Sequence, residues 1–437
     1  MKRLTPTKLT ILIILLSFAI SIYSLITYIK PFLPYKNYLL GIDRPTTYTI
    51  LLQNDTEMRA NGGFAGSYAK VTINTQGTKP NIDLSFQDIY VPNGQLNGFV
   101  KPPEPIQRAF FHGTWELANA DWEPDFPTAA TSIRWFLEKG KENNPDILAT
   151  LNLTTIKKII DIIGPFTVRE YQAEITPTNL YSFLQSQAET NFFPGSTQKK
   201  DALTAVGTAL KKKFLTLNPL QYFQIARLLK YDLDHGNLLL NATNTDFQNF
   251  LLERKWAGKI TPGAFDTYLL IEANLGANKA NCCIQRHTQH TIFEENSTYR
   301  HRVHLELNNT SSAHTPNPPF DFSGHYVSYL RFYIPSDAWN VEILPSQSSP
   351  SAAPYIPEQN ITTTKNYNLT EIGFFHTTAA GTTSTVDLSY YLATGSASTP
   401  YSLTILKQNG LTTSPQSILY QGKTISHLLD SSFTVSY

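Results

Sequence analysis

The 437-residue sequence contains few charged residues and only two cysteines. Charged side chains make up 16% of the chain and the net charge is +1, so no general attraction to nucleic acid is indicated. Cys282 and Cys283 are adjacent, which gives no zinc-ligand spacing; a vicinal disulfide is one state, and we expect two ordinary thiols. Motifs of serine hydrolases, nucleotide-hydrolysing enzymes and zinc proteases are also missing, so these classes are unsupported.

A single long apolar run lies near the start of the chain. Residues 9–29 carry no charge and can cross a hydrocarbon core of roughly 30 Å as a helix. Lys2, Arg3 and Lys8 precede the run and favour a cytoplasmic N-terminus. A cleavable signal peptide is the alternative, but the run is too long and lacks a small-residue cleavage site. We therefore expect residues 1–29 to form an uncleaved single-pass anchor in the plasma membrane, with the bulk extracytoplasmic.

The remaining sequence divides into three parts. Residues 30–46 are rich in proline and predict a juxtamembrane stalk. Residues 47–285 alternate strand and helix patterns, which predicts an α/β domain with a mixed sheet flanked by helices. The strand pattern at 267–273 is expected to complete that domain. Residues 286–437 show short alternating strands separated by turns, which is typical of an antiparallel β-sandwich.

A polar stretch, Gln53–Phe64, follows the first predicted strand of the α/β domain. We expect this strand to end in a loop at a sheet edge, where α/β proteins usually bind ligands. Asp55 and Arg59 lie in the stretch, and an arginine fork suits phosphate. Gly62 and Gly63 would let backbone approach a ligand closely. The alternative is a tight hairpin with a surface ion pair.

Asp88 comes late in a strand that could run parallel to the first one. In that case Asp88 and the Arg59 loop would lie at the same sheet edge. Coordination of a metal or pyrophosphate, or acid–base chemistry, would then be open to Asp88. An aspartate that only closes the strand into a turn is the equal alternative.

Two further groups are candidates for ligand binding. Asp121 and Asp125 lie in an acidic, proline-rich segment that suits a divalent cation, although we favour Asp125 as a helix N-cap. Lys199 and Lys200 open a predicted helix, where cations oppose the helix dipole unless an anion is bound. Solvated lysines are the commoner outcome.

The sequence resembles the bacterial family catalogued as domain of unknown function 4012. The resemblance covers about residues 47–290. It is carried by Gln53-Asn54-x-x-Glu57-x-Arg59-x-x-Gly62-Gly63-Phe64, by Ala120-Asp121-Trp122-x-Pro124-Asp125-Phe126-Pro127, by Gly164-Pro165 and by Leu275-Gly276-Ala277-Asn278-Lys279.

More distantly, the order of strands is similar to that of the LytR-CpsA-Psr phosphotransferases. These membrane-anchored enzymes move glycopolymers from a polyprenyl-pyrophosphate carrier onto peptidoglycan, with magnesium. The resemblance implies that Arg59, Lys199 and Lys200 hold pyrophosphate. It also implies that Asp88, with Asp55, coordinates Mg²⁺ or acts as a base.

We therefore expect a cell-envelope protein that binds a polyprenyl-pyrophosphate-linked glycan, with peptidoglycan as a second candidate partner. Phe110, Phe111 and Trp115, in a long loop, are candidates to line a lipid groove. Phosphotransferase activity is left open. The alternative is a non-catalytic scaffold or surface-interaction protein that retains the fold, because Gln87 and two lysines stand where the phosphotransferases have arginines.

Overall fold

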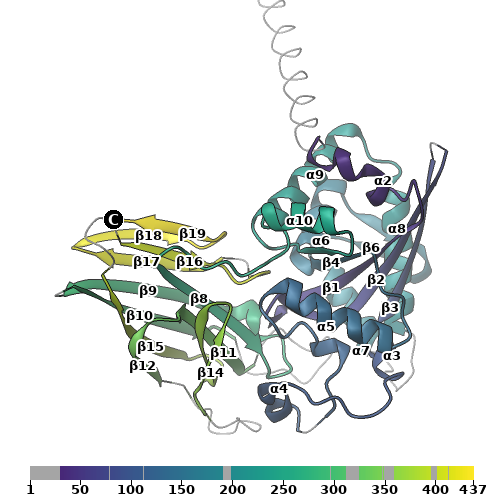
Figure 1. The fold of residues 1–437 in the computed structure, drawn as a ribbon. Coiled ribbons are helices and arrows are strands. Elements are labelled where there is room, and N and C mark those ends of the chain that lie inside the picture. The colour runs from purple at the N-terminus through teal and green to yellow at the C-terminus, as the bar shows by residue number, and fades with distance from the viewer. Residues whose placement is uncertain are drawn as a thin grey trace, which may run out of the picture.

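The computed structural model describes residues 30–77, 79–111, 113–189, 198–295, 297–311, 324–346, 348, 359–394, 401–411 and 413–437. They form an α/β part and an all-β part that lie side by side (Figure 1). The predicted membrane anchor, residues 9–29, lies outside the described residues. Within the described ranges, no helix has the length and apolar character needed to cross a bilayer.

The α/β part is built on a five-stranded mixed sheet. Its order is β3 (Lys79–Asp88), β2 (Gly62–Gln76), β1 (Thr46–Arg59), β4 (Ile147–Asn152) and β7 (Leu240–Ala242). β2 is antiparallel to both β1 and β3, whereas β4 is parallel to β1. β1 and β3 therefore run in the same direction, and their carboxyl ends lie at one edge of the sheet.

Helices cover both faces of this sheet. α5 (Phe126–Lys139) packs on one face, where Phe136 joins Leu51 and Tyr68 in a buried cluster. The other face is covered by α6 (Leu153–Ile163), α7 (Leu180–Glu189) and α8 (Gln198–Phe214), with α9 (Pro219–Asp234) packed on α6. A small hairpin, β5 (Phe166–Val168) and β6 (Ala173–Ile175), follows α6.

Polar caps explain where several of these helices begin. The side chain of Asn152 accepts a hydrogen bond from the Thr155 amide at the start of α6. Asn218 forms a capping box with Gln221 at the start of α9, next to a proline in the first turn. Such caps satisfy amide groups that have no partner within the helix. Within the alternating patterns of the α/β domain, the sequence predicts helices at 129–142, 154–163, 178–190, 197–215 and 220–229. The structure confirms them as α5 to α9, with ends shifted by a few residues.

The segment predicted as a stalk, residues 30–46, is packed against the α/β part. Its η1 (Lys30–Tyr35) and α2 (Lys36–Leu39) lie against α10 (Thr245–Glu253). The ring of Phe32 stacks on Trp256 with centroids 5.5 Å apart, and that of Tyr35 lies 5.0 Å from Phe247. Aromatic side chains therefore fix this segment, and a free stalk is the wrong description of it.

The all-β part consists of two six-stranded sheets. One has the order β12-β15-β10-β9-β17-β18 and the other β13-β14-β11-β8-β16-β19. The strands are β8 (Asp266–Asn274), β9 (Ile284–Glu295), β10 (Thr298–Asn309), β11 (Tyr326–Pro335), β12 (Trp339–Ser346), β13 (Thr362–Asn366), β14 (Leu369–Thr378), β15 (Thr383–Ala393), β16 (Ser402–Leu406), β17 (Pro415–Tyr420), β18 (Lys423–Leu428) and β19 (Phe433–Ser436).

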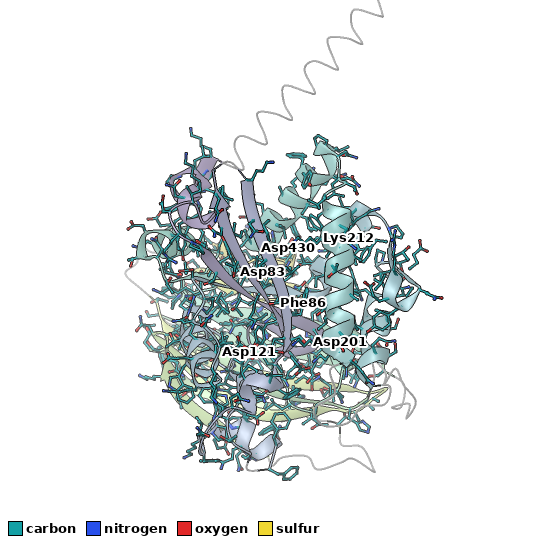
Figure 2. All side chains as sticks on the ribbon, turned by 90° about the vertical axis from the view of Figure 1, so that its right-hand side faces the viewer. Asp83, Phe86, Asp121, Asp201, Lys212 and Asp430 are labelled. Atoms are coloured by element: carbon teal, nitrogen blue, oxygen red, sulfur yellow. A yellow bond between two sulfur atoms is a disulfide. The ribbon has the colours of Figure 1, made fainter. Side chains whose placement is uncertain are left out.

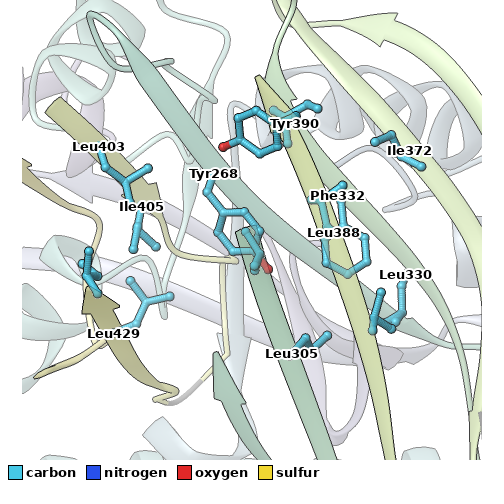
Figure 3. Close-up of a cluster of buried hydrophobic side chains, with 14 of the residues drawn as sticks. Tyr268, Leu305, Leu330, Phe332, Ile372, Leu388, Tyr390, Leu403, Ile405 and Leu429 are labelled. Carbon is cyan, nitrogen blue, oxygen red and sulfur yellow. The ribbon is translucent and has the colours of Figure 1, made fainter. Parts of the chain in front are cut away.

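The core between these sheets is apolar and aromatic. Tyr268, Leu305, Phe332 and Leu388 come from different strands and meet there with every side chain buried (Figure 3). Most strand pairs are antiparallel, as predicted, but β16 runs parallel to β8, and β17 runs parallel to β9. The sheets are therefore mixed.

Strand β8 belongs to the all-β part and not, as predicted, to the α/β part. The pattern at 267–273 was expected to complete the α/β domain, but β8 pairs with β11 and β16 in the all-β part. Almost every residue of β8 is buried, so it shows no alternation between an apolar and a polar face. A strand of that kind does not reveal from its own sequence which sheet it joins.

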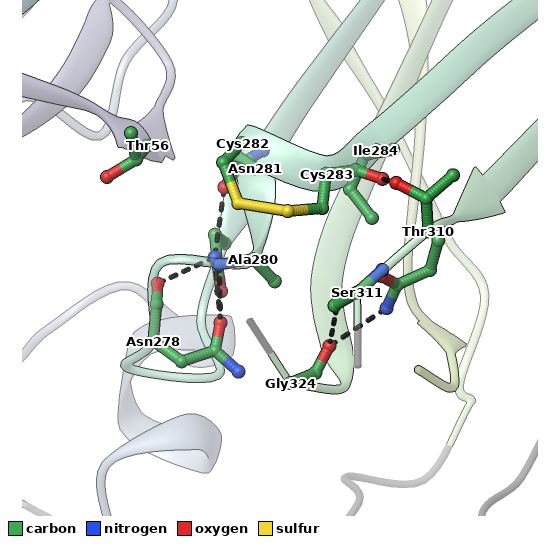
Figure 4. The surroundings of a disulfide bond; sticks show 12 residues. Thr56, Asn278, Ala280, Asn281, Cys282, Cys283, Ile284, Thr310, Ser311 and Gly324 are labelled. Carbon is green, nitrogen blue, oxygen red and sulfur yellow. Dashed lines mark hydrogen bonds between the residues drawn. A yellow bond between two sulfur atoms is a disulfide. The ribbon is translucent and has the colours of Figure 1, made fainter. Parts of the chain in front are cut away.

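The two cysteines also differ from the expectation. Cys282 and Cys283 form a vicinal disulfide in η4 (Ala280–Cys283), and the prediction of two thiols is wrong (Figure 4). That prediction assumed a strand, in which neighbouring side chains point to opposite faces. The segment is instead a short helical turn between β8 and β9.

Candidate functional site

A cavity of about 1090 Å³ lies between the α/β sheet and helices α6, α7 and α8. It is at the upper end of the roughly 300–1,000 Å³ usual for ligand sites. Most of the side chains that line it are apolar. The strands contribute Leu52, Leu84 and Phe86, and the helices contribute Ile156, Leu184, Leu203, Val206 and Leu210.

The alternation of β3 and one glycine of α8 create this apolar space. Leu84, Phe86 and Asp88 lie on the same face of β3 and all line the cavity. The ring of Phe86 faces α8 (Figure 2), where a Cβ on Gly207 would lie 2.3 Å from it. Gly207 therefore allows the helix to approach the strand at this point.

Charged side chains line the cavity mainly at the edge where β1 and β3 end. They are Glu57, Arg59, Asp88, Glu116, Lys199 and Lys279, while Lys211 lines it further along α8. The structure thus brings the predicted residues Arg59, Asp88 and Lys199 to the border of one cavity. We call the six residues Glu57, Arg59, Asp88, Glu116, Lys199 and Lys279 the mouth of the cavity. Their role in binding a ligand stays a prediction.

Asp88 and Lys199 form an ion pair at the mouth. The Nζ of Lys199 lies 3.0 Å from the Asp88 Oδ2 and donates to the carbonyl of Gly66 at 2.5 Å. Asp88 also accepts a hydrogen bond from the amide of Tyr90 at 2.9 Å. Asp88 therefore closes β3 into a turn, and at the same time it presents a carboxylate to the cavity. Lys200 is exposed and does not line the cavity.

Arg59 is engaged by the protein itself. Its side chain is 4% exposed, and it donates to the carbonyl of Asn274 at 2.5 Å, to that of Met58 at 3.2 Å and to the Asn119 side chain at 3.3 Å. It also pairs with Glu57 at 3.2 Å. The alternative of a surface ion pair is partly wrong. Arg59 and Glu57 do form an ion pair, but both side chains are largely buried. Arg59 links β1 to the all-β part.

The polar stretch is the end of a hairpin, so the expected loop is wrong. β1 continues to Arg59 and β2 begins at Gly62, with a bulge between Asn54 and Met58. A Cβ on Gly63 would lie 2.0 Å from the Asn54 backbone, and one on Gly410 would lie 2.3 Å from the Cα of Gly62. The two glycines of the hairpin therefore admit protein backbone, and neither lines the cavity.

The carboxylates named for a metal do not come together. Asp55 accepts a hydrogen bond from the Thr154 hydroxyl, burial raises its pKa, and it does not line the cavity. Asp88 is paired with Lys199. Among the described residues, no group of three or more histidine, cysteine, aspartate or glutamate side chains could hold a metal ion. Mg²⁺ usually binds through one or two carboxylates together with substrate phosphates, so its binding at Asp88 stays a prediction.

The acidic segment also serves the fold. Asp125 caps α5 through the Thr128 amide at 3.2 Å, and it accepts from the Ile260 amide at 2.9 Å. The favoured interpretation as a cap is confirmed. Asp121 is buried below the hairpin; burial raises its pKa to about 6, against the opposing effect of Arg59. Neither carboxylate lines the cavity.

Sequence reasoning missed two charged residues of the mouth. Lys279 follows β8 and Glu116 lies in the long loop after β3, and both line the cavity. Lys279 belongs to a quoted family motif, which was the available signal. In the same loop, Phe110 and Trp115 line the cavity as expected, whereas Phe111 is 63% exposed and does not.

The fold and the cavity define a two-part protein, in which a helix-covered α/β sheet with an apolar cavity adjoins a β-sandwich. Residues 43–188 match the family described as "Protein of unknown function (DUF4012)", which confirms the resemblance over that stretch. No curated protein matches the chain.

Three solved structures are similar to about half of this chain. The EF0465 protein of Enterococcus faecalis, titled a transcriptional regulator, is 12% identical with a TM-score of 0.31, over 50% of this chain and 75% of its own. TagV of B. subtilis is 11% identical with a TM-score of 0.30, over 50% and 85%. Lin1025 of Listeria innocua is 12% identical with a TM-score of 0.26, over 49% and 80%.

Proposed function

We propose that this chain is an extracytoplasmic cell-envelope protein that binds a polyprenyl-pyrophosphate-linked glycan. The observation that carries the proposal is the cavity, which is large, apolar along its length and charged mainly at one end. An isoprenoid chain would bury its surface inside, where each CH₂ contributes roughly 0.8 kcal/mol. The pyrophosphate would lie at the mouth, with the glycan outside. Residues 9–29 would hold the protein at the membrane that contains such lipids.

Lys199 and Asp88 have defined roles in this proposal. Lys199 is 32% exposed and donates to a phosphate oxygen while it remains beside Asp88. If the glycan is also transferred, Asp88 accepts the proton of the acceptor hydroxyl. That oxygen then bonds to the sugar-bearing phosphorus, and polyprenyl phosphate leaves with the electrons of the broken phosphoanhydride bond.

A non-catalytic scaffold that retains the fold is the second candidate. It is favoured by the hydrogen bonds of Arg59, all four of which go to protein groups. It is also favoured by the charges of the mouth, which has as many acidic as basic side chains. A phosphotransferase site is expected to have excess positive charge for pyrophosphate.

Binding and cleavage of geranylgeranyl pyrophosphate by the detergent-solubilised full chain test the proposal. Leu203→Trp fills the cavity from α8, and Leu215→Trp is the matched control, because Leu215 follows the same helix and is 79% exposed. We expect Leu203→Trp to weaken binding and Leu215→Trp to leave it unchanged. Release of geranylgeranyl phosphate would add cleavage of the phosphoanhydride bond, the bond that glycan transfer also breaks. Absence of binding by the folded wild-type chain would refute the lipid proposal and leave the scaffold.

A further inference from the structure

We infer that Lys279, which the all-β part contributes, is a second cation, beside Lys199, that binds the anionic headgroup at the mouth of the cavity. This inference rests on the proposed function and names one residue of its site. Four basic side chains line the cavity: Arg59, Lys199, Lys211 and Lys279. The first three are engaged by protein groups, whereas Lys279 forms no hydrogen bond or ion pair with any described residue.

The backbone on both sides of Lys279 is fixed by asparagine side chains. The Asn274 amide nitrogen donates to the carbonyl of Asn278 at 3.0 Å and to the Asn281 side chain at 2.9 Å. The Asn278 side chain donates to the carbonyl of His325 at 2.7 Å. It also accepts from the amide of Ala280 at 3.2 Å (Figure 4). The lysine therefore projects from an ordered loop, and only its own side chain needs to adapt to a ligand.

The same asparagines hold this loop against the hairpin that borders the cavity. The Asn281 Oδ1 accepts a hydrogen bond from the Met58 amide at 3.0 Å, and the carbonyl of Asn274 accepts from Arg59 at 2.5 Å. Arg59, expected to bind the pyrophosphate, thus positions the segment that carries Lys279. The headgroup site is completed across the junction of the two parts.

Of the three basic side chains at the mouth, Lys279 alone forms no ion pair with a described residue. Arg59 is paired with Glu57, and Lys199 is paired with Asp88. The remaining acidic side chain, Glu116, accepts from the Asn93 side chain at 3.0 Å, and burial raises its pKa. An incoming phosphate can form a charge-assisted hydrogen bond with Lys279 without breaking an existing ion pair.

The backbone just before the lysine is also unusual. Ala277 has a φ of +51°, in the left-handed region that favours glycine. Such conformations are unfavourable and persist where the surrounding structure enforces them, often at binding sites. The strained residue itself lines the cavity, two positions before Lys279. This conformation is consistent with a loop shaped for a ligand.

The test compares geranylgeranyl pyrophosphate with geranylgeraniol, which shares the lipid and lacks the charge, on the full chain in detergent. We expect Lys279→Gln to weaken binding of the pyrophosphate about tenfold and to leave the alcohol unchanged, because one charge-assisted hydrogen bond is lost. Lys279→Arg should restore most of the affinity. Lys212→Gln is the control, since Lys212 is an exposed lysine of α8 outside the cavity.

Each outcome separates this inference from the proposed function. If wild-type protein binds neither lipid, the proposed function fails. If wild-type protein binds the pyrophosphate and Lys279→Gln behaves like Lys212→Gln, the inference alone is overturned. Equal loss of pyrophosphate and alcohol in Lys279→Gln also overturns it, because the lysine would then support the cavity and not the charge.

Discussion

Replacement of Arg59 by methionine distinguishes an arginine that supports the fold from one that binds a ligand. Methionine keeps the apolar stem and its contact with Phe64, whose ring centroid lies 5.0 Å from the guanidinium carbon. It removes the charge and every hydrogen-bond donor of the side chain. We expect the main effect to be lower stability of the junction between the two parts, with weaker ligand binding as a consequence.

The structure gives the size of the effect. The substitution leaves the Asn274 carbonyl and the largely buried Glu57 carboxylate without the guanidinium. An unsatisfied buried acceptor costs roughly 1–3 kcal/mol, and removal of one partner from a buried ion pair costs about 3–5 kcal/mol. Because Glu57 also borders the cavity and keeps some hydration, we expect a loss near the lower end, about 3 kcal/mol. For an unfolding unit of roughly 150–250 residues, about the size of either part, that corresponds to a melting temperature lower by roughly 6–12 °C.

Thermal unfolding followed by circular dichroism measures this loss. Lys230→Met is the control, because Lys230 and its partner Asp234 are 41% and 38% exposed, and exposed pairs contribute little. We expect the control to melt close to the wild type. If Arg59→Met also melts with the wild type but no longer binds geranylgeranyl pyrophosphate, the structural role assigned to Arg59 is refuted.

Three further substitutions test the packing and the buried charges. Gly410→Ala places a Cβ 2.3 Å from the Cα of Gly62, whereas the control Gly422→Ala adds one at a similar φ with nothing within 4 Å. Gly410→Ala should therefore destabilise the chain far more, and equal melting temperatures of the two variants would contradict this. Burial raises the pKa of Asp121 from 3.8 to about 6, so the free energy of unfolding falls as pH rises between these values, by about 3 kcal/mol at most. Asp121→Asn should flatten this dependence of stability on pH in urea unfolding, and an unchanged dependence would refute the reasoning. Burial, with the nearby His301, lowers the pKa of His290 to about 3, so stability is lost as pH falls from 6.5. His290→Gln should lessen that loss, and acid unfolding identical to that of the wild type would count against this prediction.

Local signals in the sequence were sufficient for most helices and strands. The isoleucines of α6 repeat at helical spacing, and at the start of α9 an asparagine cap is followed by a proline, a recognisable signal. The strand β8 was assigned to the wrong part, because its uniform burial carries no sign of its neighbours. The vicinal disulfide was missed because the turn that contains it has no strong sequence pattern.

The candidate site was only partly predictable. Asp88 and Lys199 were found because a strand end and a helix start are recognisable, and both line the cavity. The partner of Arg59 was not foreseeable, since Asn274 is 215 residues away in the other part of the protein. Lys279 was missed for the same reason. A contact between distant segments leaves no periodicity in either of them.

Hydrogen bonds at the end of the β1–β2 hairpin join it to a segment near the other end of the chain, so they can form only late in synthesis. The Gln408 side chain donates to the carbonyl of Arg59 at 3.0 Å across 349 residues, and Asn409 donates to the Asn61 side chain at 3.2 Å. Domains generally fold as they emerge during synthesis, from the N-terminal end onward. Here the first hairpin to emerge gains its last partners only when nearly the whole chain has been made. A chain that stops before Gln408 retains an incomplete hairpin at the edge of an open apolar cavity, where a protease or chaperone can distinguish it from the finished molecule.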